Sequence, residues 1–438
     1  MCNGSIMDKL ISFALPLMLS GMLQLMFNAV DIVVVGRFSG SQSLAAVGAT
    51  TALIYLFTNL FIGISLGANV LAARYYAAGK HEEMSETVHT AMMFALISGI
   101  IMIFVGLFFS RLALEIMGTP SDVIDQATLY MRIYFLGMPF FMLYNYGAAI
   151  LRAVGDTKRP LIFLIISGVV NACLNMLLVI VFHLDVAGVA IATVTSQFIS
   201  CVLVIGCLYR TKSSYQLRFS RLKIRKEYLK PICQVGIPAG IQSTVINFSN
   251  ALLQSSVNSF GSTTMAGYTA ANNIFGFLYV SVNAITQACM SFTSQNYGLR
   301  KLKRMDKILM DCLILTVVVS LVLGGGVYLF GAEILRLYTE EAEVIRCGIE
   351  IFAYTTVTYF LCGIMDLFPG ALRGMDRSTV PMILSVIGTV GTRIVWVFWL
   401  FPAHRSLAFL FISYPASWLI TIAMQVICFY LVRRKVHG

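Results

Sequence analysis

The hydrophobic pattern of this chain consists of long apolar runs separated by short polar stretches. Runs of 18 or more predominantly apolar residues recur along its whole length, and a helix of that length crosses the ~30 Å hydrocarbon core of a bilayer. We predict an all-α membrane protein of twelve transmembrane helices. They lie near residues 10–36, 47–73, 88–109, 126–150, 160–183, 187–210, 231–257, 268–294, 308–330, 346–370, 382–402 and 407–432.

The two halves of the chain repeat one another. The segment LRAVGDTKRP at Leu151–Pro160 returns as LRGMDRSTVP at Leu372–Pro381, displaced by 221 residues, and an offset of 222 carries Pro16 onto Pro238. In membrane transporters, internal repeats of this size build two bundles, and the substrate path runs along their interface. The repeat therefore predicts two pseudo-symmetric six-helix bundles.

The longest polar stretch, Arg210 to Lys230, falls where the repeat boundary lies. We expect three parts: an N-terminal bundle over 1–209, a basic cytoplasmic linker over 210–230 and a C-terminal bundle over 231–438. Because six spans return the chain to the same side of the membrane, the halves should run parallel.

Composition and charge agree with a membrane protein and give its orientation. The chain is 58% hydrophobic and 12% charged, too little polar surface for a soluble globule of 438 residues. Of its 31 Lys and Arg residues, 24 fall on one side of the predicted spans, four on the other, and three within or at the ends of spans. Short basic loops face the cytoplasm. We expect a multi-pass protein of the cell (plasma or inner) membrane with both termini cytoplasmic. The net charge of +11 is then a topology signal that also suits an anionic inner leaflet, not a nucleic-acid site.

The chain carries no signature of an enzyme or of a resident cofactor. No GxxxxGK[ST] phosphate-binding loop is present, so ATP is not expected as the energy source. The ten cysteines are scattered without a CxxC or His/Cys cluster, which predicts neither a disulfide framework nor a structural metal. We expect a monomeric protein without enzymatic activity.

One carboxylate, Asp31, falls inside a predicted span. Insertion of such a group into the membrane costs roughly 2.5–3.5 kcal/mol, so a carboxylate in a span indicates a functional site. At helical rise Asp31 lies about 8 Å below the outer end of span one.

Polar residues of other spans reach a similar depth: Asn171, Asn175, Thr193 and Tyr130. Their oxygens suit Na⁺, and a desolvated Asp suits proton uptake. The alternative is that Asp31 snorkels outward and the asparagines only hold helices together.

The C-terminal half differs at the corresponding positions. Leu253 stands where the first half has Asp31, and Arg393 lies one residue past the equivalent of Asn171. Asp366, near the cytoplasmic end of span ten, is one candidate partner for Arg393. It could equally snorkel to the inner surface or pair with Arg373.

These residues and motifs resemble the multidrug and toxic compound extrusion (MATE) family. The resemblance rests on ALPLMLSGMLQLMFNAVDIVVVGRF near the start, VVNACLNMLLVIVF in span five and the two LR-containing segments above, and it covers residues 8–435. It implies an antiporter that exports organic cations or other amphipathic compounds against inward Na⁺ or H⁺.

The resemblance also implies roles for particular residues. Asp31, in its VD-x-x-x-V-G setting, matches the family's coupling-ion site, with Asn171, Asn175 and Thr193 beside it. Several family members carry a second acid where this chain has Asn175, so a single formal negative charge remains here and the ion, H⁺ or Na⁺, stays open. The residues expected near this site or in the substrate cavity are Gln24, Asn28 and Tyr130.

Two other functions remain as alternatives. A lipid-linked oligosaccharide flippase of the same superfamily would favour several central cations for a pyrophosphate, whereas this chain offers Asp31 and Arg393. A passive channel or a receptor is less compatible with the repeat and the intramembrane carboxylate.

Overall fold

The computed structural model describes residues 1–437, with side chains through residue 435, and this described part is all-helical. It divides into two compact units. One unit comprises Leu19–Gly240, and the other comprises Met1–Met18 together with Ile241 onward. The prediction of an all-α membrane protein with two helical bundles is confirmed.

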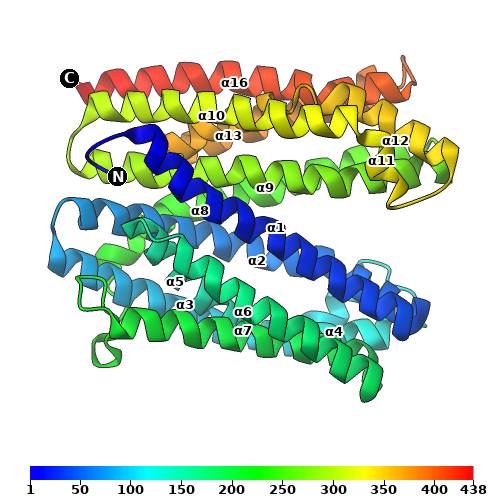
Figure 1. Cartoon of the computed structure of the whole chain (residues 1–438), viewed down its shortest axis with the longest axis horizontal. Helices are drawn as coiled ribbons and strands as arrows, with labels where there is room; N and C mark the ends of the chain where they lie inside the picture. The colour runs from blue at the N-terminus through cyan, green and yellow to red at the C-terminus, as the bar shows by residue number, and fades with distance from the viewer. Residues whose placement is uncertain (438) are drawn as a thin grey trace. The chain divides into compact units, whose positions relative to one another are not determined.

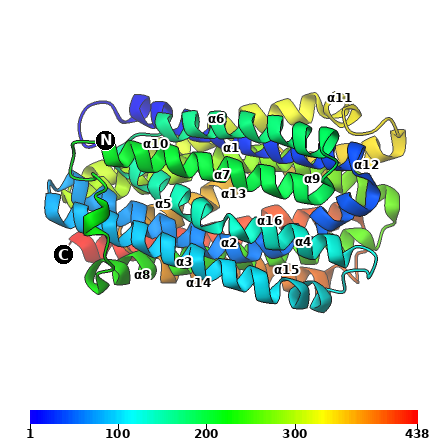
Figure 2. The ribbon, with the colours of Figure 1, turned by 90° about the horizontal axis from the view of Figure 1, so that it is seen from below.

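The unit Leu19–Gly240 contains most of the N-terminal half. Helices α6 and α7 lie side by side in both ribbon views, and they are in contact (Figure 1, Figure 2). Glycines let the backbones of α2 and α8 approach closely, since a Cβ on Gly63 or Gly67 would overlap the α8 backbone at Gly240 or Ile232. The helices with residues in this unit are α1 (Ile6–Phe38), α2 (Gly40–Ala77), α3 (His81–Ile116), α4 (Ile124–Leu136), α5 (Met138–Val154), α6 (Lys158–Asn175), η1 (Met176–Val181), α7 (Asp185–Arg210), η2 (Phe219–Arg221) and the first part of α8 (Lys226–Asn258).

The other unit contains most of the C-terminal half. Its long helices α9, α10, α13 and α16 run side by side (Figure 1). The start of α1 packs in the same core, where the Phe13 and Phe292 rings meet edge to face at 5.5 Å. The helices of this unit, besides the parts of α1 and α8, are α9 (Ser262–Gly298), α10 (Leu302–Leu329), α11 (Gly331–Arg336), α12 (Ala342–Thr355), α13 (Tyr359–Gly374), α14 (Thr379–Ser385), η3 (Val386–Gly391), α15 (Thr392–Val395), η4 (Trp396–Leu400) and α16 (Leu407–His437).

The first helix of each half is shared between the units. Residues 1–18 belong with the C-terminal helices and residues 226–240 with the N-terminal ones, whereas the repeat alone suggested a division at 209 and 231. Pro16 and Pro238 lie within continuous helices, close to the points where membership changes. Each helix therefore joins both units without a break.

Nine helices of the described chain are long and apolar enough to cross a membrane, and two bent pairs add two more. The seventh span expected from the sequence is α8, which is 33 residues long and richer in polar residues. The bent pairs are α4 with α5, at 48°, and α12 with α13, at 50°.

The two bends occupy equivalent positions but have different local causes. Pro139 stands in the first turn of α5, where it cannot donate to the preceding turn. Around the second bend, the hydroxyls of Thr355, Thr356 and Thr358 donate to carbonyls four residues back, at 2.6–3.0 Å. Such bonds compete with the helix ladder and bend it.

Turns of π-helix interrupt one span in each half. In the fifth span η1 begins directly after Asn175, and in the eleventh span η3 and η4 flank the short α15. Turns of π-helix frequently occur at functional sites. Both interrupted spans carry the polar residues singled out from the sequence, Asn175 and Arg393.

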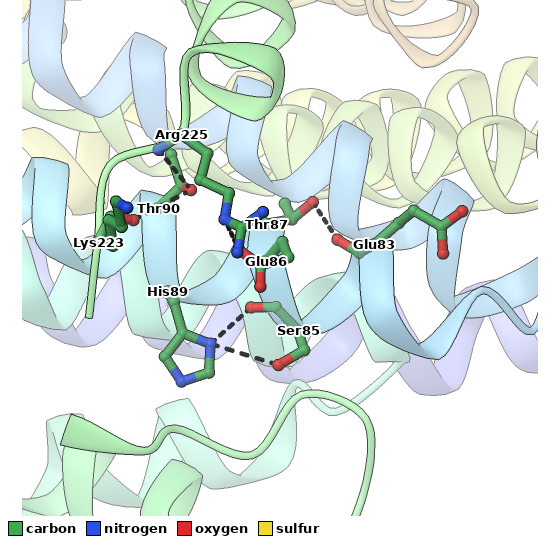
Figure 3. A network of polar contacts seen from close by, with 8 residues as sticks. All are labelled: Glu83, Ser85, Glu86, Thr87, His89, Thr90, Lys223 and Arg225. Carbon is green, nitrogen blue, oxygen red and sulfur yellow. Dashed lines mark hydrogen bonds and ion pairs between the residues drawn. The ribbon is translucent and has the colours of Figure 1, made fainter. Parts of the chain in front are cut away.

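The basic linker is attached to the start of α3 (Figure 3). Thr90 Oγ1 accepts from the Arg225 N–H at 3.3 Å, and the Arg225 guanidinium pairs with the Glu86 carboxylate at 2.6 Å. His89 accepts from the Arg218 N–H at Nε2, while its Nδ1 lies 2.6 Å from the Ser85 carbonyl. In this geometry Nε2 is the acceptor and Nδ1 is the nitrogen that donates.

Candidate functional site

The polar site of the N-terminal half forms where α1 meets α6. Gly168 on α6 lies directly against the ring of Phe27 on α1, so any Cβ there would overlap that ring. About one turn further along α1 and two turns further along α6, the Asn175 amide donates a hydrogen bond to Asp31 Oδ1. The same Nδ2 lies 3.2 Å from Asn171 Oδ1, the neighbour one turn back on α6.

This site has an unused acceptor. Asn171 and Asn175 are buried, at 5% and 0% exposure, and Asp31 is half-buried. Asn175 Oδ1 has no hydrogen-bond partner in the described part of the chain. A buried polar atom normally finds a partner. The site therefore offers a carboxylate and a free amide oxygen to a proton-bearing group or to a hard cation such as Na⁺.

Any cation held here would rely on this carboxylate and on neutral oxygens. Among the described residues, no cluster of three or more His, Cys, Asp or Glu side chains is arranged for a metal ion.

Tyr130 lies near the carboxylate of Asp31. It is buried and stacks on Tyr134, with ring centroids 6.2 Å apart. Electrostatic interactions connect Asp31 with both phenols. Sequence reasoning missed Tyr134, although its position four residues after Tyr130 on one helix face could have indicated it.

The remaining predicted residues lie differently. The Thr193 hydroxyl donates to the carbonyl of Val189 at 3.0 Å, within its own helix, which leaves its lone pairs as acceptors. Gln24 and Asn28 are exposed on α1. The structure thus joins Asp31, Asn175 and Asn171 directly. The Thr193 hydroxyl bonds within its own helix, and Gln24 and Asn28 lie exposed on α1.

In the other unit, Arg393 is buried among neutral groups. Its Nη1 donates to Asn250 Oδ1 at 2.7 Å and to Ser249 Oγ at 3.4 Å, and its Nε donates to Ser417 Oγ at 3.4 Å. The guanidinium also lies over the Tyr414 ring, 4.5 Å from the centroid. These contacts join α8, α15 and α16.

The electrostatic neighbours of Asp366 include a different arginine. Asp366 interacts electrostatically with Arg373 and Tyr279, and Arg373 Nη2 donates to Gln242 Oε1 at 2.6 Å.

Comparisons with known proteins agree with this architecture. The MatE family profile matches residues 16–177 and again 238–399. The probable multidrug resistance protein YoeA of Bacillus subtilis is 28% identical over 423 residues, which cover 94% of this chain and 91% of YoeA. The multidrug export protein MepA of Staphylococcus aureus is 21% identical over 88% of this chain and 85% of its own length.

Solved structures share the fold. An outward-facing multidrug resistance MATE transporter of the MOP superfamily aligns over 100% of this chain and 97% of its own, with a TM-score of 0.90 at 20% identity. A MOP superfamily transporter from Pyrococcus furiosus, described as having a binding pocket of reverse polarity, aligns over the same shares with a TM-score of 0.89 at 21% identity.

Proposed function

Because this chain belongs to the MATE family of membrane transporters, and is therefore a transporter and not an enzyme, we propose that it is an antiporter for multiple drugs. It exports organic cations and other amphipathic compounds by alternating access, driven by inward movement of H⁺ or Na⁺. The relatives named as multidrug resistance and export proteins support this class of cargo.

The observation that carries the proposal is the contact of Asp31 with Asn175, together with the free Oδ1 of that amide. A half-buried carboxylate with one amide donor and one nearby free acceptor is incompletely satisfied. Binding of a proton or a Na⁺ ion completes it, because either neutralises the charge, and Na⁺ also takes oxygen ligands.

Coupling follows from the charge of Asp31. A bare carboxylate disfavours positions of α1 that remove it from water, whereas the neutralised group does not carry that penalty. The ion therefore shifts the balance between conformations, and its differential binding sets how far they shift. Asp31 and Phe27 both lie on α1, and the Phe27 ring contacts α6 at Gly168. When the charge of Asp31 changes, α1 therefore moves by repacking this contact with α6.

The test uses the full-length protein in proteoliposomes with Na⁺ and pH gradients imposed separately. The cargo is rhodamine 123, a fluorescent organic cation. We expect accumulation driven by one gradient in the wild type and at least a tenfold lower initial rate in Asp31→Asn. Asp122→Asn removes an exposed carboxylate of the same unit and serves as the control.

Two results would reject the proposal. One is transport by Asp31→Asn as fast as wild type under either gradient. The other is rhodamine 123 flux in wild type that ignores both gradients, which would indicate a passive pathway.

A further inference from the structure

The linker between α7 and α8 turns back along the end of α7. The Leu217 N–H donates to the Leu208 carbonyl at 3.1 Å, and the Gln216 side-chain amide donates to the Tyr209 carbonyl at 3.1 Å. Because α7 is long and apolar enough to cross a membrane and ends at Arg210, these two carbonyls lie where the helix leaves the bilayer. The linker therefore returns to the depth of the membrane surface instead of extending away from it.

The returning segment has one face on the protein and one face that is exposed. Leu217 is buried in the hydrophobic core of the unit Leu19–Gly240, and Leu222 packs against the same core. Between them, Arg218, Phe219 and Arg221 are exposed. The hydrogen bonds to α3 hold the end of the segment as well (Figure 3). The exposed face is therefore fixed in place by the packing behind it.

Two stacked aromatic rings form the apolar part of this face. The rings of Tyr209 and Phe219 stack with their centroids 5.6 Å apart, and the two residues are 53% and 58% exposed. Ile191, Phe198 and Val202 precede Tyr209 at helical spacing and are also exposed, so Tyr209 continues an apolar face of α7. Such a face of a spanning helix contacts acyl chains, and tyrosines are enriched where the chains meet the headgroups. Phe219 lies at this boundary too, because it stacks on Tyr209.

The linker is also strongly basic. Residues 210–226 contain seven Lys and Arg residues and no Asp or Glu. Arg225 is paired with an acid of α3, whereas Arg218 and Arg221 take part in no ion pair within the part of the chain that the structure describes. The Nε of Arg218 donates to the neutral side chain of Gln216 at 3.2 Å. Two guanidinium groups without a counter-ion thus flank the exposed ring at the membrane surface.

The phosphate of an anionic phospholipid matches this combination of groups. A guanidinium binds phosphate oxygens through paired N–H groups, and basic segments beside spanning helices attract anionic headgroups. The stacked rings lie where such a lipid has its glycerol and upper acyl chains. A soluble acidic partner would use the charges but would leave the rings unexplained.

We propose that residues 209–221 form a binding site for an anionic phospholipid. Arg218 and Arg221 hold the lipid phosphate, and the rings of Tyr209 and Phe219 contact the apolar part of the same lipid. The bound lipid holds the linker against the bilayer at the end of α7. This site is separate from Asp31, and the proposal does not depend on the export function.

The test measures lipid binding to the full-length protein purified in dodecyl maltoside. Dioleoyl phosphatidylglycerol, which is anionic, and dioleoyl phosphatidylcholine, which has no net charge, are titrated separately and followed by native mass spectrometry. We expect the wild type to bind phosphatidylglycerol about tenfold more tightly, or more. Arg218→Gln combined with Arg221→Gln should weaken phosphatidylglycerol binding by about tenfold or more and leave phosphatidylcholine within about twofold, because only the charged attraction is lost.

Four variants separate the parts of the site. Lys303→Gln with Lys307→Gln removes the same number of charges at exposed positions of α10 and should leave phosphatidylglycerol binding within about twofold of wild type. Arg218→Lys with Arg221→Lys should give an intermediate affinity, since it keeps the charges and loses the paired N–H groups. Phe219→Ala should weaken both lipids alike, because it removes apolar contact without changing the charge, whereas Phe219→Trp should leave both lipids close to wild type. Size-exclusion profiles and thermal unfolding confirm that the variants fold.

Three outcomes would overturn the inference. The wild type could bind the two lipids equally, or the double arginine variant could keep its affinity for phosphatidylglycerol. In the third outcome the double lysine variant loses as much affinity as the double arginine variant, which would assign the lipid preference to the overall positive charge. None of these results involves transport, so they are independent of the test of export.

Discussion

At the scale of single residues, the proposed ion site depends on which end of the Asn175 amide faces Asp31. The NH₂ group donates to the carboxylate and also lies within reach of Asn171, so the carbonyl end stays free. An acid at this position would have added a second charge, whereas the amide stabilises the one carboxylate and provides a neutral ligand. Asn171 acts on Asp31 only through Asn175.

This chain of contacts predicts different effects for the two asparagines. Hydrogen bonds to charged groups contribute about 1.5–3 kcal/mol, so we expect Asn175→Ala to lower the gradient-driven rate of rhodamine 123 transport by about tenfold or more. Asn171→Ala should cause a clearly smaller loss, because it removes no bond to Asp31. Initial transport rates in proteoliposomes measure both effects. An equal loss in the two variants would contradict the view that Asn171 acts on Asp31 only through Asn175.

At the scale of helices, the position of α1 is fixed by a glycine on its neighbour. Gly168 allows the Phe27 ring to lie against the α6 backbone, and this contact brings Asp31 to Asn175. Close approach at small residues is how helices pack tightly in membranes. The contact between Asp31 and Asn175, which forms the proposed ion site, is therefore a consequence of helix packing one to two turns away.

Enlarging this glycine should uncouple transport from the ion gradient. Gly168→Val pushes against the Phe27 ring and moves α1 away from α6, and overpacking of this kind costs about 1–3 kcal/mol. We expect a lower unfolding temperature and the loss of gradient dependence. Gly206→Val, at a glycine with open space around its Cβ position, is the matched control. Unchanged coupling in Gly168→Val would show that the α1–α6 contact does not control the site.

The linker makes a second prediction at this scale. Glu86 pairs with Arg225, whose side chain is 50% exposed, so the pair contributes at most about 1 kcal/mol. Glu86→Gln should therefore speed trypsin cleavage within residues 211–225 by up to about fivefold, as measured by limited proteolysis of the full-length protein. Glu82→Gln, an exposed residue of the same helix, is the control. Equal cleavage of both variants would mean that the Thr90 and His89 contacts suffice.

At the scale of the whole molecule, orientation in the membrane follows from the distribution of basic residues. The loops that contain Arg74–Lys80, Arg152–Arg159 and Arg300–Lys307 should all lie on one side, together with both termini.

This orientation is tested with reporter fusions in a bacterial inner membrane. A green fluorescent protein fused after Gly438 should fluoresce and an alkaline phosphatase there should be inactive. Both should reverse when they are inserted at Glu340, in the loop before α12. An active phosphatase at the C-terminus would reverse the assigned topology.

Much of the architecture could be read from the sequence because its causes are local or periodic. Apolar runs of spanning length give the helices, the repeat at an offset of 221 gives the two bundles, and a carboxylate in a span identifies a candidate site. Asp31, Asn171 and Asn175 are candidates for this reason. Tyr134 was missed because tyrosines are common in membrane helices, and only its position beside Tyr130 and Asp31 in the structure distinguishes it.

The sequence by itself determined the helical class, the duplication and the polar residues of each half, since these depend on composition and spacing along one chain. Only the tertiary structure decided which polar groups meet. It joined Asn175 to Asp31, directed Thr193 back to its own helix, and surrounded Arg393 with Asn250, Ser249, Ser417 and Tyr414. Partners of this kind come from different helices, and their rotation and separation depend on packing details such as Gly168 against Phe27. Hydropathy fixes how deep a residue lies, and packing fixes which neighbour it contacts.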